Sequence, residues 1–143
     1  MNKIKIYFFH PYSGYGGADL SISRLISGID LSKFDIEFIS LNKANFLKKK
    51  IKNIKFSEIN SQRTFKAFKR IKQLILNDKK YKKKIFVSNQ YFANVLSLYF
   101  LRKFNNLKIV LFERNHISEL YNYFSFTDFF KKILIKVLIK FNY

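Results

Sequence analysis

The chain has 143 residues, 48% of them hydrophobic, which is enough to bury the core of one domain and too few for two ordinary ones. It carries 28 basic and 9 acidic residues, a formal net charge of +19 that favours an anionic partner such as a phosphate ligand, a nucleic acid or a lipid surface. AT-rich codons also enrich a chain in Lys, Asn, Ile, Phe and Tyr, so composition alone leaves a genomic origin of this charge open. The absence of cysteine excludes disulfides and thiolate metal sites, and two histidines are too few for a histidine-based metal cluster.

The first predicted elements flank a glycine-rich loop. Apart from Lys5, residues 4–9 are β-branched or aromatic, and they stop at His10-Pro11, which predicts a buried strand. Apolar residues then recur at helical spacing from Ala18 to Ile29. The loop between them holds Gly14, Gly16 and Gly17. Because open α/β sheets bind ligands at the carboxyl ends of their strands, and helix N-termini favour anions, we expect a phosphate-binding loop here, with a tight turn that binds nothing as the alternative.

The rest of the chain continues the alternation of strands and helices. Strands are predicted at 35–40, 54–59, 85–88 and 107–112, with 54–59 alternating apolar and polar residues as an edge strand does. Helices are predicted at 44–51, 65–75 and 91–103, and a last one at 128–141. This order predicts an α/β fold: a doubly wound, mostly parallel, Rossmann-like sheet in a single domain over residues 1–143.

The predicted helix at 128–141 has apolar side chains along one face and Lys132, Lys136 and Lys140 on the other. That face either packs on the sheet or contacts an anionic membrane peripherally. No apolar run is long enough to span a membrane: Lys5 interrupts the first, and residues 91–101 have about half the length required. We therefore expect a cytoplasmic protein, with peripheral contact at the inner face of the membrane as the further possibility.

Two common phosphate-binding motifs do not fit the glycine-rich loop. The dinucleotide fingerprint requires a third glycine where Asp19 stands, and an acidic residue at the end of the second strand. That strand ends in Ser40-Leu41-Asn42. A P-loop requires Gly-Lys followed by Ser or Thr, which is absent.

Three short motifs, in order, resemble the N-terminal half of group 1 (family 4) glycosyltransferases. The first is Gly-Gly-Ala-Asp at 16–19, followed by Phe-Ile-Ser-Leu-Asn at 38–42. The second is the strand and helix start at 87–96, which contains Ala-Asn-Val, and the third is Glu-Arg-Asn at 113–115. The family usually has Glu where Asp19 stands, and many relatives place a His closer to Glu113 and Arg114 than His116 is here.

The resemblance implies a GT-B fold, in which two Rossmann-like domains face each other across a cleft. The N-terminal domain mainly binds the acceptor, and the C-terminal domain mainly binds the nucleotide-sugar donor. Transfer retains the anomeric configuration and requires no essential metal and no cofactor besides the nucleotide-sugar co-substrate. The donor-phosphate loop implied for this chain consists of Gly14, Gly16, Gly17 and Asp19.

The resemblance also implies residues near the acceptor. The acceptor-side loop residues are Asn89 and Asn115, and the catalytic candidates are Glu113, Arg114 and His116. The alternative for Glu113 and Arg114 is an ion pair that only shapes their loop. No residue is expected to bind metal.

We expect a C-terminal donor domain to be missing from this chain, because no residue pair here replaces the donor-binding acids. The 143 residues alone are then inactive, unless a separate chain supplies that domain. The expected partners are a nucleotide-sugar and a glycan or lipid-linked acceptor, in surface polysaccharide or lipopolysaccharide biosynthesis.

Two other functions stay open. The first is a basic nucleic-acid-binding module, since 19% of the residues are aromatic and neighbours such as Tyr81-Lys82 can stack on bases and hold phosphates. Against it, many aromatic residues lie on predicted core faces and the lysines are spread along the chain, so nucleic acid is not the expected partner. The second is a non-catalytic remnant of a truncated gene, which aggregates because its interdomain face is exposed.

Overall fold

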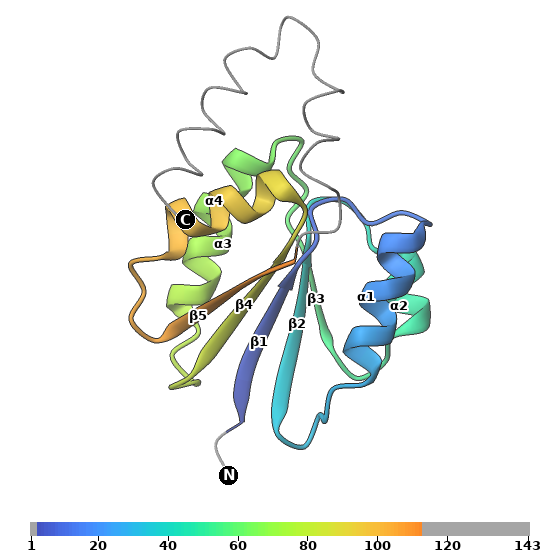
Figure 1. Ribbon diagram of the computed structural model, residues 1–143, viewed down its shortest axis with the longest axis horizontal. Helices are drawn as coiled ribbons and strands as arrows, with labels where there is room; N and C mark the ends of the chain where they lie inside the picture. The colour runs from blue at the N-terminus through green and yellow to red at the C-terminus, as the bar shows by residue number, and fades with distance from the viewer. Residues whose placement is uncertain (1–2, 113–143) are drawn as a thin grey trace, which may run out of the picture.

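The computed structural model describes residues 3–112, and these form an α/β domain (Figure 1). The strands are β1 (Ile4–Phe9), β2 (Phe34–Ser40), β3 (Lys55–Glu58), β4 (Lys84–Asn89) and β5 (Leu107–Phe112). The helices are α1 (Gly17–Ser27), α2 (Asn45–Lys50), α3 (Thr64–Asn77) and α4 (Tyr91–Leu101). The predicted elements in this part of the chain are therefore confirmed, whereas the predicted helix at 128–141 lies outside the described residues.

The five strands make one parallel sheet in the order β3-β2-β1-β4-β5, so the predicted doubly wound, Rossmann-like fold is confirmed. β1 lies in the centre, with Phe8 opposite Phe38 of β2 on one side and Val87 of β4 on the other. The predicted edge strand at 54–59 is β3, which pairs only with β2 among the described strands. Because all strands are parallel, every loop that follows a strand opens at the same edge of the sheet.

Helices cover both faces of the sheet, and the alternation of side chains along β1 assigns each face its core (Figure 1). Tyr7 and Phe9 belong to the core cluster that also contains the buried residues of α3 and α4. Ile6 and Phe8 belong to the cluster that contains Ile22 of α1 and its neighbours on α2. Strands whose two faces are both buried are typical of parallel sheets, and this is why the strands appear in the sequence as short continuous apolar runs.

α3 is held on the sheet by aromatic contacts. Phe68 is fully buried, and its ring lies edge-to-face on Phe9 with centroids 5.3 Å apart. The same ring stacks on Phe100 of α4 at 5.4 Å. Such pairs add about 0.5–1.5 kcal/mol each to the area that they bury. Phe68 therefore joins the central strand to both helices of this face.

A charged network lies at the amino ends of β1, β2 and β3, on the face of α3. Lys5 is buried, and its ammonium lies 3.0 Å from Asp35 and 3.3 Å from Glu37. Lys55 reaches the other oxygen of Glu37 at 3.1 Å. The hydroxyl of Tyr81 donates a hydrogen bond to Asp35. Burial, this hydrogen bond and the charge of Asp35 raise the pKa of the Tyr81 phenol to about 12.

The helix ends differ slightly from the sequence-based bounds. Ile29 has helical spacing, but α1 ends at Ser27, because Gly28 follows and its N–H closes the last turn on the carbonyl of Arg24. Ile29 still packs against the core cluster beneath α1. Within the described residues, no helix has the length and hydrophobicity needed to cross a membrane.

Candidate functional site

The glycine-rich loop connects the carboxyl end of β1, at the centre of the sheet, to the start of α1 (Figure 1). Gly14, Gly16 and Gly17 are exposed, and a Cβ atom added at any of them meets no other atom of residues 3–112 within 4 Å. None of the three has a positive φ angle. Neither the backbone conformation nor internal packing therefore requires glycine at these positions, and the predicted alternative of a tight turn that depends on glycine loses its main physical support.

The start of α1 has no side-chain cap among the described residues. Its N-cap residue is Gly16, and no side chain of residues 3–112 caps the helix by a hydrogen bond. The first N–H groups of a helix have no partner within the helix, and they carry partial positive charge. At the glycines, the loop has backbone N–H groups and no side chains that would cover them. This arrangement suits a phosphate group.

Asp19 folds back under the loop. It is 4% exposed, accepts a 2.7 Å hydrogen bond from the Ser13 hydroxyl and accepts a 3.2 Å bond from the Gly14 N–H. Of the four residues predicted to form the donor-phosphate loop, Asp19 is therefore the one that holds the loop from beneath, whereas the three glycines line its exposed side.

Asn42 ties this loop to the loop that follows β2. The Ser13 N–H donates to Asn42 Oδ1 at 2.9 Å, and Asn42 Nδ2 donates to the Ser13 carbonyl at 2.6 Å. The Ser40 hydroxyl donates to the Asn42 carbonyl at 2.7 Å. The end of the second strand therefore supports the glycine-rich loop through polar side chains, and it carries no acid of the kind that holds a dinucleotide ribose.

His10 and Asn89 meet at the ends of β1 and β4. Both are buried, and Asn89 Nδ2 lies 2.8 Å from His10 Nδ1. With the amide as donor, Nδ1 accepts, and the neutral ring carries its proton on Nε2. Nε2 faces Asp19 Oδ1 at 3.8 Å, which is longer than a hydrogen bond. The ring of His10 therefore lies between the amide of Asn89 and the carboxylate of Asp19 beneath the loop.

Two buried polar atoms at the end of β4 have no hydrogen-bond partner within residues 3–112, namely Ser88 Oγ and Asn89 Oδ1. Asn89 is 5% exposed, and the next residue, Gln90, has a φ of 92°, a backbone conformation that is strained for a residue with a side chain. A buried carbonyl oxygen without a donor is unfavourable by about 1–3 kcal/mol. The end of β4 thus holds two buried polar atoms that the residues of 3–112 leave without a hydrogen-bond partner.

Next to these atoms lies an apolar depression on the α1 face. It is lined by His10 and Asn89 together with Leu25 of α1, Val87 of β4 and Phe112 of β5. Leu25 and Phe112 are more than a third exposed. Its volume is about 10 Å³, which is far too small for an organic ligand, so among the described residues the depression is a shallow apolar surface beside the end of β4.

The described structure brings together only some of the predicted site residues. Gly14, Gly16, Gly17, Asp19 and Asn89 all lie at the carboxyl edge of the sheet. Glu113, Arg114, Asn115 and His116 lie outside the described residues.

Sequence reasoning missed several polar residues of this edge: His10, Ser13, Asn42 and Ser88. Each stands at or just after a predicted parallel strand, and this position is the signal that identifies them. Within residues 3–112, no group of three His, Cys, Asp or Glu side chains is placed to hold a metal ion.

Comparisons of the chain with protein-family models, with curated proteins and with solved structures gave no match.

Proposed function

We propose that this chain is the N-terminal, acceptor-side domain of a retaining glycosyltransferase, which moves a sugar from a nucleotide-sugar to a glycan or lipid-linked acceptor. The proposal rests on the resemblance of the motifs at 16–19, 38–42 and 87–96 and on the position of their residues at one edge of the sheet. It places no acid in contact with the donor sugar, so transfer requires a second domain or chain. The biosynthesis of surface polysaccharide remains part of this proposal.

The observation that carries the proposal is the empty space around the three glycines of the loop. Glycine is costly in entropy, and it is useful where the backbone turns with positive φ, packs closely or approaches a ligand closely. Within residues 3–112, the three loop glycines have no positive φ angle and do not pack closely against other atoms. Close approach of a ligand from solvent is the remaining use, and the open N-terminus of α1 makes that ligand an anion.

In this proposal, the backbone N–H groups of Gly16 and Gly17 face the donor phosphates. Asp19 and Asn42 hold the loop in place from beneath and from the side. His10 holds the amide of Asn89, which stays the acceptor-side residue of the proposal at the end of β4. These side chains bind and orient, and the chemistry of transfer takes place in the cleft completed by the second domain.

The test is a nuclear magnetic resonance titration of the chain with UDP and with GDP. We expect the amide signals of Gly14, Gly16 and Gly17 to shift, with weak, millimolar affinity because in this proposal the domain contributes mainly the acceptor side of the cleft. G16V and G17V should weaken binding about tenfold or more, which corresponds to about 1.4 kcal/mol. Both variants should stay folded, because an added Cβ meets no atom of residues 3–112 within 4 Å, and G16V should lose only the N-cap preference of glycine, about 1 kcal/mol.

G28A is the matched control, at the other end of α1. Its Cβ makes ordinary contacts at 3.6 and 3.7 Å, so binding should be unaffected. If neither nucleotide shifts the loop, or if G16V binds as the wild-type chain does, the glycine-rich loop is not a donor-phosphate site and the proposal fails.

A further inference from the structure

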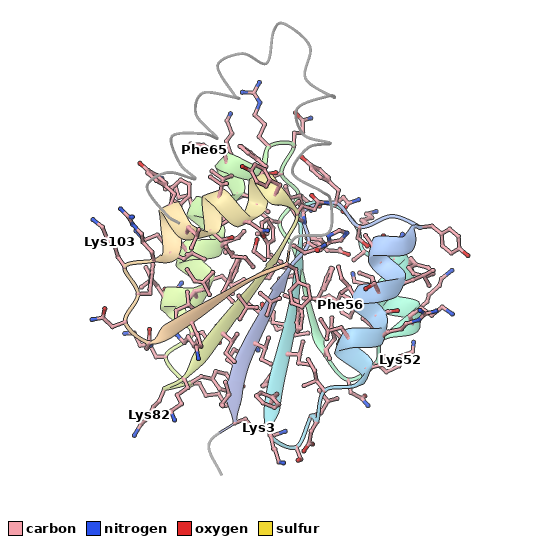
Figure 2. The ribbon with its side chains drawn as sticks, in the orientation of Figure 1. Lys3, Lys52, Phe56, Phe65, Lys82 and Lys103 are labelled. Atoms are coloured by element: carbon pink, nitrogen blue, oxygen red, sulfur yellow. The ribbon has the colours of Figure 1, made fainter. Side chains whose placement is uncertain are left out.

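Positive charge gathers at the edge of the sheet opposite the glycine-rich loop. Residues 79–112 contain no Asp or Glu. Their basic residues are Lys79, Lys80, Lys82, Lys83, Lys84, Arg102, Lys103 and Lys108. All of these lie in or beside the loops that precede β4 and β5, and such loops open at the amino edge of a parallel sheet. Figure 2 shows Lys82 and Lys103 at this margin, reaching away from the sheet.

Part of this edge is concave. A hollow of about 520 Å³ is lined by Lys82, Lys83, Lys84, Lys108, Asn105 and Asn106. The ammonium of Lys84 is buried and donates to the Ile75 carbonyl, and Ile4 of β1 and Ile85 of β4 provide apolar surface. Among the described residues, no acidic and no aromatic side chain lines it. The amides of the two asparagines supply hydrogen-bond donors beside the ammonium groups, so the lining offers charge and donors together.

The charge of the lysines in this hollow is not neutralised by ion pairs. Within residues 3–112, no carboxylate lies within ion-pair distance of Lys82, Lys83 or Lys108. Most lysines of the described residues likewise have no carboxylate partner, so the distinguishing feature here is that several of them line one hollow without an acid. Like charges around a concave surface raise the local positive potential and concentrate anions there.

We propose that this hollow, which we name the β4–β5 amino-edge site, binds a ligand that carries a phosphate monoester. A phosphate dianion matches lysine ammonium groups and amide donors around one hollow, and lysine binds phosphate as a point charge. The absence of aromatic residues argues against single-stranded nucleic acid, which binds by stacking its bases on aromatic rings. The phosphate comes either from a soluble metabolite or from a phosphomonoester lipid headgroup.

The site is separate from the glycine-rich loop. It lies at the amino ends of β1, β4 and β5, whereas the loop follows the carboxyl end of β1. A strand of six residues spans about 20 Å, so one small ligand cannot occupy both. The inference therefore stands whether or not the chain is a glycosyltransferase domain.

The test is a titration of the ¹⁵N-labelled chain with inorganic phosphate and with glycerol 3-phosphate at physiological salt. We expect amide shifts concentrated at 82–85 and 105–108. The double variant Lys83→Gln, Lys108→Gln should weaken binding about tenfold or more, through the loss of two charge-assisted contacts. The matched control is Lys49→Gln, Lys50→Gln, which removes the same charge from exposed positions of α2 and should leave the affinity unchanged.

Vesicles distinguish the two sources of phosphate. If the chain co-sediments with phosphatidic acid vesicles but not with phosphatidylcholine vesicles, and the Lys83/Lys108 variant loses this binding, the site is supported and the source is a lipid. Shifts with glycerol 3-phosphate and no vesicle binding support the site and identify a soluble ligand. The inference is overturned if the two double variants lose affinity equally, if shifts spread evenly over the lysines of the chain, or if an oligonucleotide displaces phosphate and quenches tyrosine fluorescence by stacking.

Discussion

Replacing Asp19 tests whether the glycine-rich loop is held from beneath by this carboxylate. In D19A, the Ser13 hydroxyl loses its acceptor while it stays buried, which costs about 2 kcal/mol. The Gly14 N–H also loses its acceptor, but Gly14 is exposed, so water replaces it at a cost of about 0.5–1 kcal/mol. The expected loss is about 3 kcal/mol in the free energy of unfolding, measured by urea denaturation followed by circular dichroism.

D19N is the matched variant, because it keeps the shape and removes only the charge. Its amide oxygen can accept from the Gly14 N–H, while its NH₂ donates to the Ser13 hydroxyl, which is able to rotate. We expect a loss of about 1 kcal/mol or less, and hydrogen exchange at Gly14 that stays slow in D19N but becomes fast in D19A. If D19A is as stable as the wild-type chain, or if D19N is destabilised as much as D19A, the hydrogen bonds to Asp19 do not hold the loop.

Two further predictions concern the core and the charged network. F68A should lower the free energy of unfolding by about 3–5 kcal/mol, because the ring of Phe68 is fully buried. L76A, on the same helix but half exposed, should change it by less than about 0.5 kcal/mol. Equal losses in urea denaturation would contradict the packing of α3. The Tyr81 phenol has its pKa raised from 10.0 to about 12, so the stability that it contributes with Asp35 is complete below pH 10 and lost as the pH rises through 12. Tyrosinate absorbance should show a late ionisation that is absent in Y81F, and an unchanged titration curve in Y81F would refute this assignment.

The fold could be predicted because each element carries its own local signal. The strand bounds predicted at 4–9 and 107–112 agree with β1 and β5 to the residue, since short apolar runs end in polar or turn residues there. The predicted helix ends agree less closely with the structure than the strand bounds do. Residues 102–103 were predicted to continue α4, but α4 ends at Leu101. Local spacing identifies the face of a helix better than its last turn.

The polar network at the carboxyl edge could not be predicted, because it depends on the order of strands in the sheet. His10 and Asn89 are 79 residues apart and meet only because β4 pairs with β1. Lys5 is a similar case at the other edge. In the sequence it interrupts an apolar run, yet it is 4% exposed in the fold, because Asp35 and Glu37 of the neighbouring strand neutralise it.

The central position of β1 has a consequence for synthesis of the chain on the ribosome. β1 is made before its partner β4, which begins only at Lys84. At about 5–20 residues per second, one edge of β1 waits on the order of ten seconds for that partner. During this interval its apolar run exposes unpaired backbone groups, which are a template for aggregation. The nascent chain is therefore most exposed to chaperones, and to misassembly, before residue 89 emerges.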